Sequence, residues 1–263
     1  MDLTDVLLLL GAGVGAGVVN SVAGGGSLIT YPALVATGLG SVVANVTNSV
    51  AVSAGYASSA VGTWPDHRAL ERSQGKSVRA LALTAAVGAV AGCALLLLTP
   101  ATAFDKVVPF LVLGAVAVLA FQQRLKNLVG HPHELPRTRR TATLHTAVGL
   151  SAVYGGYFGA AVGIILVALI GLVMDETLIR VTALKNSLSV VIGLVTIAVF
   201  SAFGTAAGSP VHWASVAVLT PATLVGGYVG ARVGRRLDPR VLRAVIVTFG
   251  TAVGLILGWR AFG

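Results

Sequence analysis

Long apolar stretches, separated by short polar connections, run through the whole chain of 263 residues. They lie at about 6–39, 42–64, 77–98, 107–121, 143–174, 178–203, 212–231 and 241–259. Eight membrane spans of about 20 residues would take up about 160 residues of chain. The pattern therefore predicts an all-helical, polytopic membrane protein with no room for a large soluble domain.

The first and the fifth stretch are too long for one straight span, because each runs for more than 30 residues. Both are interrupted by glycines, namely Gly24, Gly25 and Gly26 in the first and Gly155, Gly156 and Gly159 in the fifth. A broken helix, or a re-entrant pair of short helices, needs such a length and such breaks. We expect each stretch to form either a re-entrant pair or two short spans.

Basic residues gather in three of the polar connections. They are Arg68, Arg72, Lys76, Arg79, Arg124, Lys126, Arg137, Arg139, Arg140, Arg232, Arg235, Arg236, Arg240 and Arg243. Lys and Arg are enriched in cytoplasmic loops, so these connections are predicted to be cytoplasmic. The connections near 99–105 and 204–211 then lie outside, and counting crossings places the N-terminus outside as well.

Composition changes the picture in one respect, since the net charge of +9 would suggest nucleic acid in a soluble protein. Here 56% of the residues are apolar and 10% are charged, against roughly 25% charged residues in a soluble domain. The basic residues instead indicate membrane topology, and no nucleic-acid partner is expected. Cys93 is the only cysteine, so neither a disulfide nor a cysteine-based metal site is expected, and no cofactor is predicted.

The chain repeats itself at an offset of 138 residues without a gap. The matching pairs are Gly17 and Gly155, Gly25 and Gly163, Asn48 and Asn186, Ser49 and Ser187, Gly88 and Gly226, and Gly92 and Gly230. Each half makes an odd number of crossings, so the halves enter from opposite sides. We predict a first repeat at 1–125, a basic cytoplasmic linker at 126–142 and a second repeat at 143–263, related as the inverted repeats of many secondary transporters are.

The first break is the first candidate binding site. Its residues are Asn20, Ser21, Gly24, Gly25, Gly26 and Ser27. Glycines at membrane depth leave backbone N–H groups uncovered, and such groups at a helix N-terminus bind anions. The alternative is that the glycines only permit close helix packing. A nucleotide-binding P-loop is excluded, because no Gly-Lys-Ser/Thr follows.

A second candidate pairs polar residues of the two repeats. They are Asn45, Thr47 and Asn48 in the first half, and Asn186 and Ser189 in the second. A symmetric pair near the membrane midplane is where inverted-repeat folds bind substrate. The alternative is that Asn48 and Asn186 only join helices, each contributing about 0.6 kcal/mol on average.

Lys185 is the one Lys or Arg well inside an apolar stretch, and no Asp or Glu lies mid-span to neutralise it. A charge at the centre of a span costs roughly 3 kcal/mol on insertion scales and marks a functional site by default. Its alternative is to extend toward the cytoplasmic interface. An uncompensated Lys predicts an anionic substrate.

Tyr157 either lines the second broken segment or packs against neighbouring residues.

No catalytic constellation is found, so the chain is not expected to be an enzyme. The Gly88–Gly92 and Gly226–Gly230 spacings suit either a homodimer or internal helix packing. A flippase or transporter of lipid phosphates, which would also need an anion site between repeats, is the alternative function. A passive scaffold would not need Lys185.

Two sequence motifs resemble those of the TauE/SafE family of sulfite and organosulfonate exporters. They are the run from Asn20 to Leu34 followed by 44–49, and in the second half 155–159 with 183–186. The resemblance covers nearly the whole chain. It implies a permease of the bacterial inner membrane for small sulfur-containing anions. Without an ATPase motif, transport would be secondary, by alternating access at the repeat interface.

Overall fold

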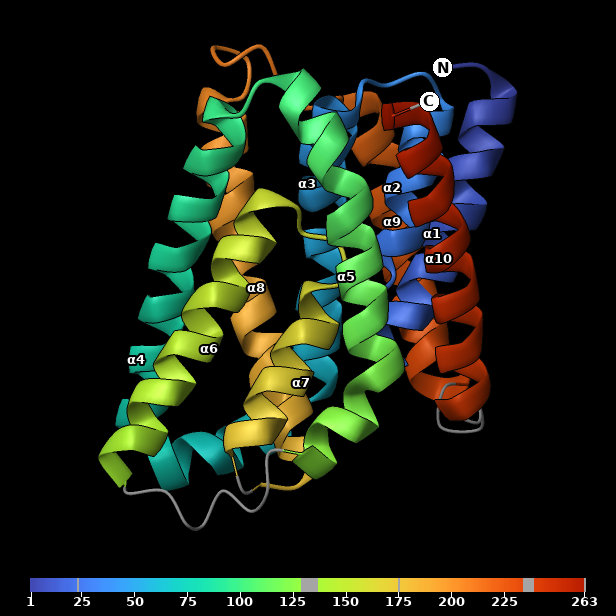
Figure 1. Ribbon diagram of the computed structural model, residues 1–263. Helices are drawn as coiled ribbons and strands as arrows, with labels where there is room; N and C mark the ends of the chain where they lie inside the picture. Colours follow the sequence, from blue (N-terminus) through green and yellow to red (C-terminus); the bar gives the residue numbers. More distant parts are fainter. Residues whose placement is uncertain (23, 129–136, 175, 234–238, 263) are drawn as a thin grey trace.

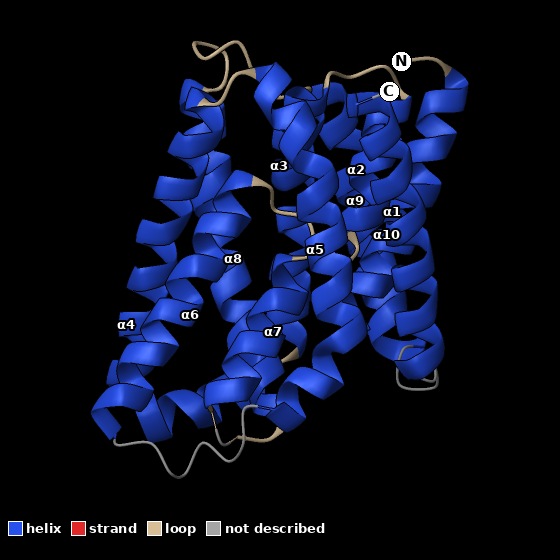
Figure 2. Ribbon diagram, viewed as in Figure 1, coloured by secondary structure: helices blue, strands red, loops and turns tan. Residues whose placement is uncertain are grey.

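The computed structural model describes residues 1–22, 24–128, 137–174, 176–233 and 239–262. Most of these residues are helical, and none of them forms a strand (Figure 2). The helices are α1 (Leu3–Val22), α2 (Ser27–Ala36), α3 (Ser41–Gly62), α4 (Trp64–Leu98), α5 (Ala101–Leu128), α6 (Arg137–Tyr157), α7 (Val162–Val173), α8 (Leu178–Phe203), α9 (Trp213–Val233) and α10 (Pro239–Phe262). The predicted all-helical fold is confirmed.

Both overlong stretches are split into a longer and a shorter helix. The first becomes α1 and α2, and the fifth becomes α6 and α7. In Figure 1, α2 leads back toward the end of the bundle at which α1 begins, and α7 leads back toward the end at which α6 begins. Each break therefore lies inside the bundle, as the glycines predict.

The sequence suggested that the basic connection after α3 is a loop, but in the structure it is helical. Helix α4 begins at Trp64, with Pro65 in its first turn, and carries Arg68, Arg72 and Arg79 on exposed positions. Pro is favoured at the first helical positions, and the Ala, Leu, Glu, Arg and Gln residues that follow are good helix formers. The third span is thus the inner part of a helix of 35 residues.

Most exposed basic residues of the described chain lie at one end of the bundle, whereas Lys106, near the start of α5, lies toward the other. Helices α4 and α6 begin at the basic end and α5 ends there, while both chain termini lie at the opposite end (Figure 1). Arg139 and Arg180 belong to the basic end, in the first turns of α6 and α8. Parts of the predicted linker at 126–142 and of the 232–243 connection, namely 129–136 and 234–238, fall outside the described residues.

Glycines bring two pairs of helices into backbone contact. A Cβ on Gly92 would lie 2.1 Å from the Val153 carbonyl oxygen of α6, and one on Gly226 would lie 2.1 Å from the Val14 oxygen of α1. Helix α4 therefore packs tightly on α6, and α9 on α1. These spacings are used for internal packing, so they supply no argument for a dimer.

Large apolar side chains cover the outside of the bundle. Leu83, Leu98, Leu150 and Trp259 are at least 65% exposed, as expected of residues that face lipid. Five described helices are long and apolar enough to cross a membrane. Helix α3 is not among them, because asparagine, serine and threonine residues interrupt its apolar sequence.

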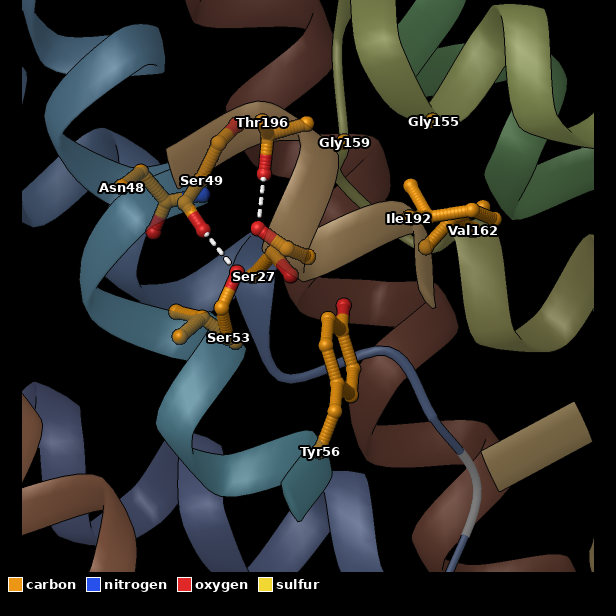
Figure 3. A pocket seen from close by; sticks show the side chains of 12 residues that line it. Ser27, Asn48, Ser49, Ser53, Tyr56, Gly155, Gly159, Val162, Ile192 and Thr196 are labelled. Carbon is orange, nitrogen blue, oxygen red and sulfur yellow. Dashed lines mark hydrogen bonds between the residues drawn. The ribbon is translucent and has the colours of Figure 1, made fainter. Parts of the chain in front are cut away.

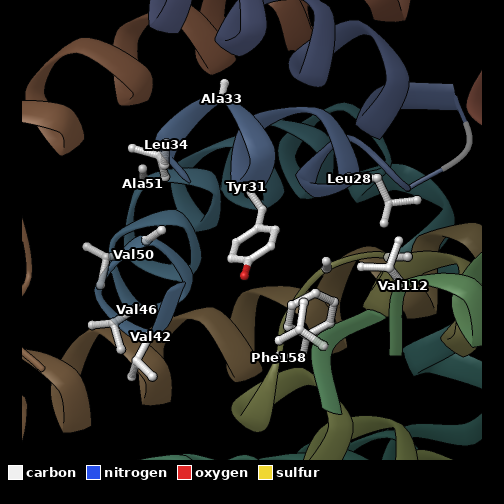
Figure 4. Packing of buried hydrophobic residues seen from close by; sticks show 14 of the residues in the cluster. Leu28, Tyr31, Ala33, Leu34, Val42, Val46, Val50, Ala51, Val112 and Phe158 are labelled. Atoms are coloured by element: carbon white, nitrogen blue, oxygen red, sulfur yellow. The ribbon is translucent and has the colours of Figure 1, made fainter. Parts of the chain in front are cut away.

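The apolar core closes around the breaks. Tyr31 of α2 meets Phe158, which follows α6, edge to face at 5.4 Å between ring centroids (Figure 4). Phe104 of α5 also packs against Phe158, with 6.3 Å between ring centroids. Aromatic pairs in this geometry contribute about 0.5–1.5 kcal/mol beyond their buried area. The rings thus fix α2 against the second break.

The α4–α6 contact gives a test of the packing. Gly92→Ala should lower the free energy of unfolding by about 1–3 kcal/mol, because the added carbon displaces the backbone of α6. Gly114→Ala on α5 is the matched control, since no atom lies within 4 Å of its Cβ position. Thermal unfolding in detergent measures both, and equal midpoints would contradict the contact.

Candidate functional site

The two breaks rest on residues in the left-handed backbone region. Gly24 (φ +82°) lies between α1 and α2, and Gly159 (φ +72°) and Ala161 (φ +61°) lie between α6 and α7. Glycine adopts this region without strain, whereas an alanine there costs about 1–3 kcal/mol. Ala161 immediately precedes α7. Ala161 thus adopts, at the start of α7, a backbone conformation that costs free energy.

The breaks meet at the centre of the bundle. A Cβ on Gly24 would lie 3.1 Å from the Gly163 carbonyl carbon, and one on Gly163 would lie 3.0 Å from the Gly24 carbonyl oxygen. Since α2 begins at Ser27 and α7 at Val162, the N-termini of both half-helices lie at this contact. Each N-terminus carries roughly half a positive charge. Some of the first N–H groups already donate to the preceding turn, as Leu28 does to Gly25 and Ile164 to Ala161.

Side chains hold both breaks in shape. Asn20 Oδ1 accepts a hydrogen bond of 2.8 Å from the Gly26 N–H. Asn45 Nδ2 donates to the Tyr157 carbonyl oxygen at 2.9 Å, and Tyr154 Oη donates to the Ala160 carbonyl oxygen at 2.8 Å. Asn20 and Asn45 are thus supports of the backbone that forms the site.

Lys185 lies beside the meeting point. Its side chain is 3% exposed, and a Cβ on Gly163 would lie 3.4 Å from its Cδ. Within the part of the chain that the structure describes, no hydrogen bond or ion pair links its ammonium group to another residue. The cation therefore adds to the positive ends of α2 and α7 instead of cancelling them.

Most buried polar side-chain atoms without a partner lie on residues predicted for the site, whereas Tyr31 and Ser49, which carry one each, are not among the predicted residues. Among the described residues these atoms include Asn20 Nδ2, Asn45 Oδ1, Asn48 Nδ2, Ser49 Oγ, Asn186 Oδ1 and Ser189 Oγ. An unsatisfied buried polar group costs about 1–3 kcal/mol. Such groups need an explanation, and a polar ligand or water that binds in transit supplies one.

Comparison with known proteins assigns the chain to a family. The family described as "Sulfite exporter TauE/SafE" matches residues 9–257, nearly the whole chain. The chain belongs to the TauE/SafE family. The resemblance of its two motifs to this family is thereby confirmed.

Relatives of this TauE/SafE chain carry transporter names. It is 27% identical over 261 residues to the probable membrane transporter protein YfcA of Escherichia coli strain K12, covering 94% of this chain and 87% of the relative. It is 25% identical over 243 residues to the probable membrane transporter protein ORF9 of a Sinorhizobium species, covering 92% and 88%. No solved structure matches. The chain is thus a multi-pass membrane transporter.

A small cavity of the TauE/SafE chain lies next to the meeting point. Its lining comes from α2, α3, α8 and the second break, and includes Ser27, Asn48, Ser49, Ser53, Tyr56 and Thr196 (Figure 3). The cavity measures about 10 Å³, close to the space that one water molecule needs. In this conformation the cavity is therefore too small for any larger solute, which could bind there only if the lining helices moved apart.

Some residues predicted for the site lie away from it. Asn186 Nδ2 donates to Thr63 Oγ1 at 3.1 Å, at the start of α4. Because α3 and α8 cross antiparallel, this lies roughly 20 Å along α3 from Asn48. The two asparagines therefore do not bracket one ligand in this conformation, and Asn186 joins helices as the alternative reading had it.

Two further predicted residues stabilise neighbouring helices. Ser21 Oγ donates to the Val18 carbonyl oxygen and lies against Gly230 of α9. Thr47 Oγ1 accepts a hydrogen bond of 3.0 Å from the His212 N–H, just before α9. Both face α9 or the segment that leads into it, not the meeting point.

Sequence reasoning missed the hydroxyl groups of Ser53 and Thr196. A signal for one was available, because Lys185, Ser189, Ile192 and Thr196 follow a spacing of i, i+4, i+7 and i+11. Such residues share one face of a helix. The buried Ser189 thus connects Lys185 to the cavity along α8.

The second break gives a test. Asn45→Ala removes the donor of the Tyr157 carbonyl oxygen, so the free energy of unfolding should fall by about 1–3 kcal/mol. Thr143→Ala, on an exposed position of α6, is the control and should change it by less than about 0.5 kcal/mol. Thermal unfolding midpoints compare the two variants. Equal midpoints would mean that this hydrogen bond does not hold the break.

Proposed function

We propose that this protein is a secondary transporter of small sulfur-containing anions such as sulfite or organosulfonates, working as an exporter in the bacterial inner membrane. The family description suggests sulfite as the substrate and export as the direction. The chain's own residues favour an anionic substrate. The observation that carries the proposal is the meeting of two half-helix N-termini beside a buried lysine.

The charge distribution favours an anion over a cation. Ser27 and Val162 begin the two half-helices, and Lys185 packs against Gly163. All nine carboxylate residues of the sequence lie outside the breaks and the interiors of the spans. Half-helix N-termini point at anionic substrate groups in transporters with broken helices. A sulfite or sulfonate group would receive N–H groups from both helices and the charge of Lys185.

The order of helices supports two repeats related by inversion. In each half a long helix precedes a short one, and three long helices follow. The contacts between helices repeat when the two halves are exchanged. Helix α1 packs on α9, as its counterpart α6 packs on α4. Helix α3 packs on its counterpart α8, and α5 packs on its counterpart α10. We take 1–125 and 143–263 as the repeats, and the positive-inside rule places the N-terminus outside.

The crossing of α3 and α8 suits rocking of one repeat against the other. A Cβ on Gly193 would lie 2.7 Å from Ser53 Oγ, so the helices touch at one small residue of α8. Polar residues flank this point on both sides, with Asn48 toward one end and Asn186 toward the other. Alternating access would open the meeting point first to one side and then to the other.

Export of an anion needs no ATP. An inside-negative membrane potential favours its exit by about 2.3 kcal/mol per charge and per 100 mV. A carrier that opens its anion site to each side in turn is therefore sufficient for net efflux.

Flux into or out of proteoliposomes tests the proposal. The purified protein should show saturable flux of sulfite or sulfoacetate, compared with taurine, thiosulfate and phosphate. Lys185→Ala should reduce it about 10- to 100-fold, the loss expected for a charge-assisted contact. Arg180→Gln is the matched control, because Arg180 lies on the same helix but is exposed and pairs with Glu176.

The outcomes separate the parts of the proposal. Flux that survives Lys185→Ala would keep the transport function and remove Lys185 as a substrate ligand. Absence of flux for every sulfur anion would contradict the function. Movement of a short-chain lipid phosphate in the same vesicles would then favour the lipid-phosphate alternative.

A further inference from the structure

Three of the hydroxyl groups that line the cavity between α3 and α8 differ in their hydrogen bonds. Those of Ser53 and Thr196 donate to backbone carbonyl oxygens, whereas that of Ser49 has no partner among the described residues. Figure 3 shows these three side chains around the same space. The donors and acceptors that these hydroxyl groups leave unused decide which group of a substrate can bind in the cavity.

Ser53 and Thr196 can only accept a hydrogen bond from a ligand. Ser53 Oγ is 2.6 Å from the Ser49 carbonyl oxygen, and Thr196 Oγ1 is 2.8 Å from that of Gly193. A carbonyl oxygen has no hydrogen to give, so each hydroxyl must be the donor of its bond. The remaining lone pairs of both hydroxyls are free to accept.

The other lining groups include donors, and Ser27 and Tyr56 each add a hydroxyl group. Asn48 Nδ2 and Ser49 Oγ are buried and have no partner among the described residues. Ser49 is 8% exposed, and its Oγ lies 2.8 Å from the Cβ position of Gly159. The cavity therefore offers donors on its α3 side together with acceptor-only oxygens from α3 and α8.

The surroundings of the cavity are positive. Ser27 and Val162, the first residues of α2 and α7, both line it, and Lys185 packs beside Gly163. Positive helix ends and a buried ammonium disfavour a sodium ion, which acceptor oxygens alone would accommodate. A ligand that is negatively charged and also presents a hydrogen can use both kinds of group.

We propose that the protein binds its oxyanion in a hydrogen-bearing, singly charged form, which for sulfite is hydrogen sulfite. The charged oxygens accept from Asn48 and Ser49, and the acidic hydrogen is donated to Ser53 or Thr196. This rests on the proposed function and narrows its substrate class, because organosulfonates and sulfate carry no acidic hydrogen near neutral pH. Ser53 and Thr196 are the specificity-determining residues.

The lining of the cavity comes from both repeats, and its counterpart at the offset of 138 is only partly polar. Asn48 and Ser49 match Asn186 and Ser187, and Thr196 matches Ser58, whereas Ser27, Ser53 and Tyr56 match Ile165, Val191 and Leu194. The acceptor Ser53 therefore has no polar counterpart in the other repeat.

The test compares sulfite with methanesulfonate, a single-charged anion without an acidic hydrogen. Initial flux into proteoliposomes is measured at equal pH on both sides, from acidic to alkaline, with protein-free vesicles as the blank. Thr196→Val and Ser53→Ala are the variants. Ser151→Ala is the matched control, since its buried hydroxyl makes the same kind of bond, to the Ala147 carbonyl oxygen at 2.7 Å, outside the cavity.

Wild type and Ser151→Ala should move sulfite at a rate that falls as hydrogen sulfite loses its proton. They should prefer sulfite over methanesulfonate by roughly tenfold, the effect of about one hydrogen bond. Thr196→Val should lose most of that preference. Equal rates for both anions with a flat pH profile would overturn the inference and leave sulfur-anion transport standing.

Two other results separate this inference from the transport function. Flux that is flat with pH but requires sodium would place a cation in the cavity and overturn the inference. Thermal stabilisation of the purified protein by sulfite is the second readout. If it falls with rising pH and is lost in Thr196→Val while no flux occurs, the site stands and transport falls; if neither flux nor stabilisation occurs, both fall.

Discussion

Two positive helix ends that face each other inside a membrane protein set the central constraint of this fold. The N-termini of α2 and α7 meet through Gly24 and Gly163, and Lys185 adds a full charge beside them. Nothing in the sequence of either break carries a negative charge. A centre built in this way gains most from a ligand that brings the missing negative charge.

Glycine and the small residues around it make this centre possible. They let α4 approach α6 and α9 approach α1 at backbone distance, and they let two chain breaks touch. Because the same pairings recur with the halves exchanged, each half packs its long broken helix on the other half. A movement of one half must therefore reshape the centre, which is the coupling that alternating access requires.

Much of this could be read from the sequence, and its limits have physical causes. Hydropathy and glycine runs predicted the helices and both breaks, and the lack of mid-span acids drew attention to Lys185. The repeat matched Asn48 with Asn186, but α3 and α8 cross antiparallel, so matched residues lie on opposite sides of the crossing. Ser53 and Thr196 resemble ordinary back-bonded hydroxyls within helices, and only the crossing shows that they share a cavity.

Locating the bound anion tests the central claim most directly. Selenite is a heavier analogue of sulfite, and its anomalous scattering marks its place in a crystal of the protein. The account predicts a peak at the N-termini of α2 and α7, within contact of Ser27, Val162 or Lys185. A peak only among the exposed basic residues of α4 and α6, with none at the meeting point, would contradict it.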